Sequence, residues 1–139
     1  MNRLLKTMMI SLTVLIVVGI TGFIIFINIT NEDAKGEPQS IDEINEYSYE
    51  TPEVTTDLKD GKFVRIQFQI VTDGKKALKE VDKREFQIKN ILIKELAVMT
   101  EEDFKTGLTD LEATMQSKLN EVMTDGSITD VYTISKILQ

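Results

Sequence analysis

The sequence of 139 residues contains no histidine, no cysteine and no tryptophan. Without histidine and cysteine, the chain lacks the groups for His-based acid–base catalysis, for Ser-His-Asp or Cys-His arrangements and for zinc sites of the usual ligand types. The lack of cysteine also excludes disulfides and a cysteine-linked lipid anchor. The folded part must therefore be stabilised by an ordinary hydrophobic core.

Acidic side chains remain as a route to catalysis or metal binding, and their pattern gives little support for either. The tightest cluster, Glu101-Glu102-Asp103, lacks the spaced oxygen ligands of a calcium loop. Acids in the first turn of a helix are stabilised by the helix dipole and need no further role. No glycine-rich phosphate-binding loop occurs in the sequence. We predict that the protein is not an enzyme, that it has no catalytic, cofactor-binding or metal-binding residues, and that it acts on no small-molecule substrate.

Charge is also missing between Lys6 and Glu32, where no side chain is ionisable. A helix of about 20 apolar residues matches the hydrocarbon core of a bilayer, which is about 30 Å thick. A cleaved signal peptide would have a shorter apolar region that ends in a small-x-small motif, and the sequence Ile25-Phe26-Ile27-Asn28 offers no such motif. We predict a transmembrane helix over residues 7–30. Because it contains no charge, the helix alone should not form an ion path.

The remaining charges predict the orientation of the chain and the kind of partner it meets. Arg3 and Lys6 precede the apolar run, so residues 1–6 are expected in the cytoplasm and the rest of the chain outside. Without these two residues the chain has 14 basic and 23 acidic side chains, a formal charge of −9. Such a domain repels nucleic acid and anionic lipid headgroups, which favours protein partners. The basic pairs Lys75-Lys76 and Lys83-Arg84 are predicted to be solvated helix faces.

Residues 31–50 are rich in acids, with seven Asp or Glu against a single Lys35. This composition predicts an acidic linker over residues 31–50. Ser40 and Glu43 have the spacing of a capping box, which leaves two interpretations for residues 40–47. They form either a short helix that docks on a partner or a solvated tether. We favour the tether, because isolated helices of this length are marginal in water.

The domain at residues 51–139 is predicted to begin with a hairpin. Residues 54–58 favour a strand, and Asp60-Gly61 is a strong signal for a tight turn, because both residues tolerate positive φ. Over residues 64–70, apolar and polar side chains alternate, as in a strand with one buried face.

The rest of the domain is predicted to be mostly helical. Apolar spacing predicts one long helix over residues 75–99 and another over 108–122. Thr100 followed by three acids resembles a capped helix start. Residues 131–138 favour a final strand. The order β-β-α-α-β predicts a small α+β domain with helices covering one sheet face, in which the last two strands can be parallel.

The last nine residues, Val131-Tyr132-Thr133-Ile134-Ser135-Lys136-Ile137-Leu138-Gln139, are similar to the closing strand of the flagellar basal-body-associated FliL family. That strand usually reads Val-Tyr-Phe-Thr-Glu-Phe-Val-Ile-Gln. Thr133 and Lys136 stand at its aromatic positions, so an outer face of the strand is expected to pack differently. Three further blocks resemble the family: Lys89-Asn90-Ile91-Leu92-Ile93, Thr100-Glu101-Glu102-Asp103-Phe104 with Gly107, and Leu119-Asn120.

This resemblance implies a single-pass protein of the inner or cytoplasmic membrane, with an external domain like the stomatin (SPFH) fold. It implies homo-oligomeric rings around the flagellar stator proteins MotA and MotB, which support stator assembly or torque and hence swimming, swarming and chemotaxis. The family has no known catalytic residues. A different interpretation of the same layout is a generic membrane-anchored extracytoplasmic module that binds an external peptide or wall component.

Overall fold

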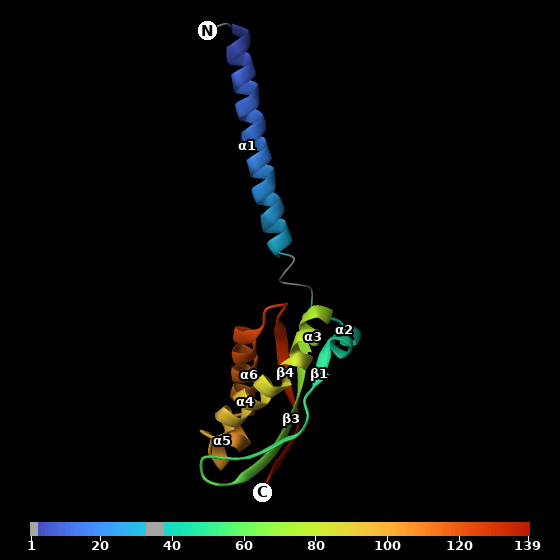
Figure 1. Cartoon of the computed structure of the whole chain (residues 1–139), viewed down its shortest axis with the longest axis vertical. Coiled ribbons are helices and arrows are strands. Elements are labelled where there is room, and N and C mark those ends of the chain that lie inside the picture. The colour runs from blue at the N-terminus through green and yellow to red at the C-terminus, as the bar shows by residue number, and fades with distance from the viewer. Residues whose placement is uncertain (1–2, 33–37) are drawn as a thin grey trace. The chain divides into compact units, whose positions relative to one another are not determined.

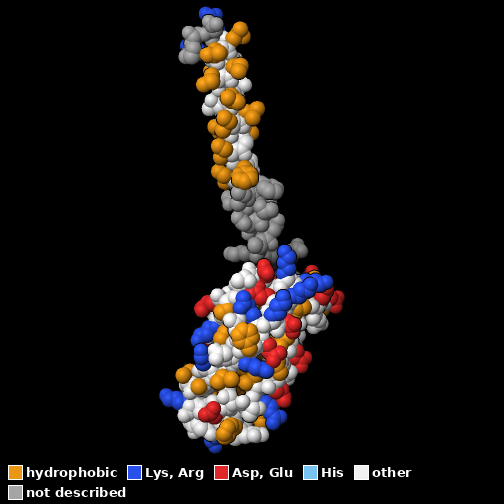
Figure 2. Space-filling view, in the orientation of Figure 1, with side chains coloured by type: hydrophobic (Ala, Val, Ile, Leu, Met, Phe, Trp, Pro, Cys, Tyr) orange, Lys and Arg blue, Asp and Glu red, His pale blue; other side chains and the backbone are white. Residues whose placement is uncertain are grey.

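The computed structural model describes residues 3–32 and 38–139, and two compact units divide the chain, residues 1–39 and 40–139. The first unit contains one helix, α1 (Arg3–Glu32) (Figure 1). Its segment Arg3–Ile24 is long and apolar enough to cross a membrane, judged by length and composition. The apolar side chains between Leu4 and Ile24 are exposed, as Figure 2 shows.

The second unit is built on an antiparallel sheet of four strands (Figure 1). These strands are β1 (Ser48–Glu50), β2 (Val54–Asp57), β3 (Phe63–Thr72) and β4 (Ile128–Leu138). β4 pairs with β3 along nearly its whole length, so β1 and β2 share the other edge of β3, one after the other. The predicted alternation in β3 is confirmed, because Val64, Ile66, Phe68 and Ile70 are all buried.

The last two strands are antiparallel, with Ile70 opposite Val131 and Val64 opposite Leu138. The parallel arrangement that the helical connection allowed is therefore not adopted. The helical segment between them leaves the sheet after Thr72 and returns beside it, since Thr72 pairs with Ile128 and the Asp73 N–H donates to the carbonyl of Ser127. A connection that starts and ends at the same end of a sheet reverses the strand direction.

Four helices form this connection and cover one face of the sheet (Figure 1). They are α3 (Lys75–Lys83), α4 (Glu85–Leu96), α5 (Glu101–Thr106) and α6 (Leu108–Val122). Their buried side chains pack with β3 into one core, which includes Leu92, Leu96, Phe104 and Met115. The predicted α+β class and the covered sheet face are confirmed.

The single long helix predicted over residues 75–99 is wrong, because the helix breaks at Arg84 (φ −97°, ψ 14°). The two parts lie against different strands, α3 against β1 and β3, and α4 against β2. Apolar spacing cannot reveal this break. Val81 and Ile88 are seven residues apart and remain on one side of the helix path, so both are buried.

The predicted linker over residues 31–50 is also wrong for its second part. Ser40 begins the folded unit as the N-cap of α2 (Ile41–Glu46), and its hydroxyl forms a capping box with Glu43. Strand β1 follows directly, with Tyr49 opposite Ile70. Tertiary contacts compensate for the shortness of these elements, since the Tyr49 hydroxyl donates a hydrogen bond to Glu85 of α4. Burial and this hydrogen bond raise the pKa of Tyr49 to about 12. The favoured interpretation of residues 40–47 as a solvated tether is therefore wrong, because a short helix forms there. Residues 33–37 of the predicted linker lie outside the described residues.

Candidate functional site

The acidic cluster Glu101-Glu102-Asp103 builds a helix start, as predicted. Thr100 and Asp103 form a capping box, in which the Thr100 N–H and hydroxyl donate to the Asp103 carboxylate. These bonds hold the pKa of Asp103 below its usual value. Glu101 pairs with Lys105, and its N–H donates to Asp60 from the turn before β3. Over residues 3–32 and 38–139, no group of three His, Cys, Asp or Glu side chains is placed to hold a metal ion.

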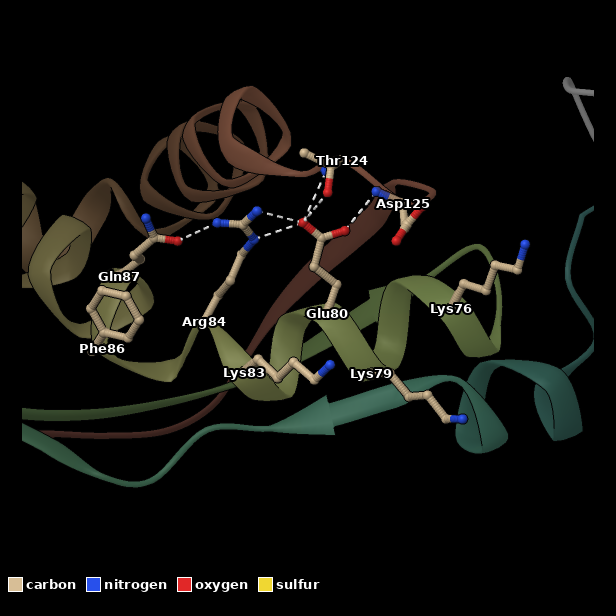
Figure 3. Close-up of a pocket in the computed structure, with 9 residues that line it drawn as sticks. All are labelled: Lys76, Lys79, Glu80, Lys83, Arg84, Phe86, Gln87, Thr124 and Asp125. Carbon is tan, nitrogen blue, oxygen red and sulfur yellow. Dashed lines mark hydrogen bonds and ion pairs between the residues drawn. The ribbon is translucent and has the colours of Figure 1, made fainter.

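The densest polar network lies instead around Glu80, near the end of α3 (Figure 3). Its carboxylate accepts hydrogen bonds from Nε and Nη2 of Arg84, from the N–H and hydroxyl of Thr124, and from the N–H of Asp125. We call this group the Glu80 latch, because it ties α3 to the loop between α6 and β4. Partial burial alone would raise the pKa of Glu80, but the bonds from Asp125, Arg84 and Thr124 outweigh it and lower the pKa to about 2.

No pattern in the sequence predicts the Glu80 latch. The spacing of Glu80 and Arg84 is that of an ordinary exposed helix pair. Its other partners, Thr124 and Asp125, are more than 40 residues away, and no pattern within a local stretch reveals such a contact. Arg84, predicted to be on a solvated face, is half-buried in this network and also donates to Gln87.

Beside the latch lies a groove of about 590 Å³, lined by α3, the start of α4 and the Thr124–Asp125 loop. Lys76, Lys79 and Lys83 project from α3 along it, and Phe86 stands at its α4 end (Figure 3). Lys75 and these three lysines are exposed or nearly so, as predicted for solvated helix faces.

A second surface is the face of the sheet opposite the helices. β3 places Arg65, Gln67 and Gln69 on this side, because they alternate with its buried residues. Phe63 is 57% exposed and Tyr132 is 48% exposed on the same side. The two departures from the family strand pattern lie on the other side: Thr133 is opposite Phe68 and Lys136 opposite Ile66, both helix-facing. The expectation of a changed outer face is therefore wrong.

The outer edge of β4 is covered in its first half by polar side chains of α6. Asn120 exchanges two hydrogen bonds with the backbone of Ile128, and Gln116 donates to the carbonyls of Ile128 and Thr129. Glu112 accepts from the N–H of Thr133 at 2.7 Å. These three residues are spaced by four and so form one line on the helix. Beyond them, β4 has a bulge, because Ser135 and Thr133 are opposite the adjacent Gln67 and Phe68.

The chain has a candidate membrane helix followed by a small α+β domain with an antiparallel sheet. By class it is an α+β protein with a candidate N-terminal membrane anchor. Residues 48–139 match the family model described as flagellar basal body-associated protein FliL. The flagellar protein FliL of Bacillus subtilis (strain 168) is 32% identical over 103 residues, which cover 73% of this chain and 74% of that relative. The chain belongs to the FliL family.

Family membership confirms the resemblance found in the sequence and associates the protein with the flagellar basal body. It also agrees with the prediction that the protein is not an enzyme, since this is a family of flagellar accessory proteins and not a known enzyme family. The matched residues start at Ser48, the first residue of β1. The family model thus covers all four strands of the sheet, and α1 and α2 lie before it.

Proposed function

We propose that the protein is a single-pass component of the flagellar motor in the cytoplasmic membrane. Residues 1–6 lie in the cytoplasm, residues 7–30 cross the membrane, and the unit from Ser40 to Gln139 lies outside. The family match across the whole sheet, joined to an apolar N-terminal helix, carries this proposal. Arg3 and Lys6 before the apolar run support the orientation, since positive charges flanking a first helix stay in the cytoplasm.

The external unit associates with copies of itself and with the stator proteins MotA and MotB, and it supports stator assembly or torque. Copies anchored in one plane reach a high effective concentration, so weak contacts between domains suffice for a ring. A head-to-tail contact that closes is the geometry such a ring needs. The exposed Phe63 and Tyr132 on the uncovered sheet face supply apolar contact area. The stomatin (SPFH) likeness implied by the family remains a prediction.

Motility tests the motor role. Deletion of the gene should reduce swimming most in viscous medium, where torque is limiting, and the full chain supplied from a plasmid should restore it. An N-terminal fluorescent fusion should form foci at flagellar motors. Normal swimming of the deletion strain at high viscosity, together with fluorescence spread evenly over the membrane, would contradict the proposal.

The absence of natural cysteine makes the orientation simple to measure. Single cysteines are introduced by Asn2→Cys and, at an exposed position of the domain, Lys59→Cys. A membrane-impermeant maleimide added to intact cells should label Lys59→Cys and leave Asn2→Cys unlabelled until the cells are lysed. The reverse pattern would place the domain in the cytoplasm.

A further inference from the structure

The groove beside the Glu80 latch has an unusual charge for this acidic protein. We propose that it binds an acidic segment of a partner protein, with the lysines of α3 contacting carboxylates and Phe86 contacting an apolar side chain. This binding site is additional to the motor role proposed above and does not depend on it. The proposal follows from four observations: the unpaired lysines, the occupied carboxylates, the exposed aromatic ring and the shape of the surface.

The lysines of the groove have no partner within the described part of the chain. The side chains of Lys76, Lys79 and Lys83 make no ion pair or hydrogen bond there, although the chain has 23 acidic and 16 basic residues. Exposed lysines elsewhere on the domain are also unpaired within the described residues, but the groove gathers three of them on one helix. Three unpaired ammonium groups on one helix produce a local positive potential that attracts an anion.

The carboxylates near the groove are mostly engaged in contacts other than with its lysines. Glu80 accepts five hydrogen bonds in the latch, so its charge is already compensated by Arg84 and by backbone N–H groups. Asp82, three residues after Lys79 on α3, is not part of the lining, and its charge acts on Tyr49 of β1. Asp125 is left as the carboxylate on the lining. The four basic residues of the lining thus exceed its two acidic residues by two charges, in a protein of net charge −7.

Phe86 gives the groove an apolar end. Its side chain is 70% exposed, although it follows directly on the break between α3 and α4. Figure 3 shows its ring beside Gln87, turned away from the latch. The step from Lys76 to Lys83 rises about 10 Å, a length that three to four residues of extended chain would span. The surface therefore suits a short acidic segment with one apolar residue at its end.

The arrangement of nearby charges favours a polypeptide over an anionic membrane surface. Figures 1 and 3 both show α2 beside α3, and α2 exposes Asp42, Glu43 and Glu46. A flat anionic bilayer that reached the lysines would also meet these acids, which would repel it. A narrow chain that follows the side of α3 carrying Lys76 and Glu80 keeps away from α2, toward which Lys79 extends (Figure 3).

Binding of a labelled peptide tests the proposal. The full chain in nanodiscs of neutral phosphatidylcholine is titrated against a fluorescein-labelled peptide of Glu and Asp with one terminal Leu, about eight residues long, and anisotropy is followed. Binding should weaken about tenfold, or ~1.4 kcal/mol, in the variant K76Q/K79Q/K83Q, because each exposed ion pair contributes up to ~1 kcal/mol. Phe86→Ala should weaken binding about threefold through the lost apolar contact.

The control variant K59Q/K62Q/K94Q removes the same charge from three exposed lysines outside the groove, and it should bind like the unmodified protein. A peptide with Gln in place of Glu and Asn in place of Asp should not bind. Equal weakening in both triple variants, or no binding of the acidic peptide by the unmodified protein, would overturn the proposal.

A second measurement distinguishes the membrane as occupant. Acetylation of Lys76, Lys79 and Lys83 is followed by mass spectrometry in neutral nanodiscs and in nanodiscs that contain phosphatidylglycerol. The acidic peptide should slow acetylation in both. Slowing by phosphatidylglycerol without peptide would assign the groove to lipid and overturn the proposal. Neither experiment uses a flagellar component, so its failure leaves the proposed motor role intact.

Discussion

The two faces of strand β3 differ in what they contribute to the protein. On the helix-covered face, Val64, Ile66 and Phe68 are at most 1% exposed. On the opposite face, Arg65 and Gln67 are half-buried and Phe63 is 57% exposed. Residues of the two faces alternate along the same ten-residue strand. The amino-acid composition of β3 therefore does not tell which face is buried. The comparison indicates that the covered face supplies stability and that the open face is available for contact.

The largest effect is expected from Phe68→Ala on the covered face. Phe68 is fully buried among the helices, and its truncation leaves a cavity. The free energy of unfolding should fall by about 3–5 kcal/mol. Urea unfolding of the full chain in detergent micelles, followed by circular dichroism, measures this loss. A loss below about 1 kcal/mol would mean that the helices do not close over this face as described.

A smaller loss is expected from Glu80→Gln, which weakens the Glu80 latch at the end of the covered face. The pKa of Glu80 is lowered from 4.5 to about 2 in the folded protein, so its contribution is present above pH 4.5 and is lost as the pH falls through 2. The thermal midpoints of the unmodified protein and the variant should differ at pH 7 and converge between pH 4.5 and 2. A difference that does not depend on pH would show that the charge of Glu80 is not what holds the loop.

Next in size is Thr100→Ala, which removes the cap of α5. This helix presents Phe104 to the covered face, where its ring is 1% exposed. Loss of an N-cap hydroxyl typically costs about 1 kcal/mol, and urea unfolding should show that decrease. Thr55→Ala is a suitable control, because Thr55 is exposed in β2 and should change the free energy of unfolding by less than about 0.5 kcal/mol.

The smallest effect on stability is expected from Phe63→Ala, which matches Phe68→Ala in residue type and strand but lies on the open face. The free energy of unfolding should change by less than about 0.5 kcal/mol. Swimming in viscous medium should nevertheless decrease if this face makes contacts in the motor. A large loss of stability would erase the difference between the two faces, and normal swimming would exclude Phe63 from the contact surface.

Sequence patterns predicted the parts of the fold that local physics determines. The alternation in β3, the turn at Gly61 and the cap at Thr100 depend on neighbouring residues, and the structure contains each of them. Gly61 has φ +81°, a conformation that glycine adopts readily. The family resemblance was also carried by local blocks, chiefly the closing strand.

The features that the sequence did not predict depend on contacts between distant residues. Strand β1 has only three residues, Ser48–Glu50, and pairing with β3 across some twenty residues decides its conformation. The direction of β4 depends on where the helices return, and the break at Arg84 leaves the apolar spacing unchanged. Prediction of the groove would require the same knowledge of long-range contacts, because Thr124 and Asp125 complete a lining that begins on α3. Its lysines were visible in the sequence, but their common surface was not.

The line of polar side chains on α6 bears on solubility. Unpaired strand edges are templates for aggregation, and a protein concentrated in a membrane plane would bring many such edges together. Glu112, Gln116 and Asn120 occupy backbone groups of Ile128, Thr129 and Thr133 in β4. The rest of the edge carries a bulge at Ile134 and the charge of Lys136, two features that discourage pairing with a foreign strand. In the proposed ring of copies, neighbouring domains would thus meet through side chains while pairing between their sheets is discouraged.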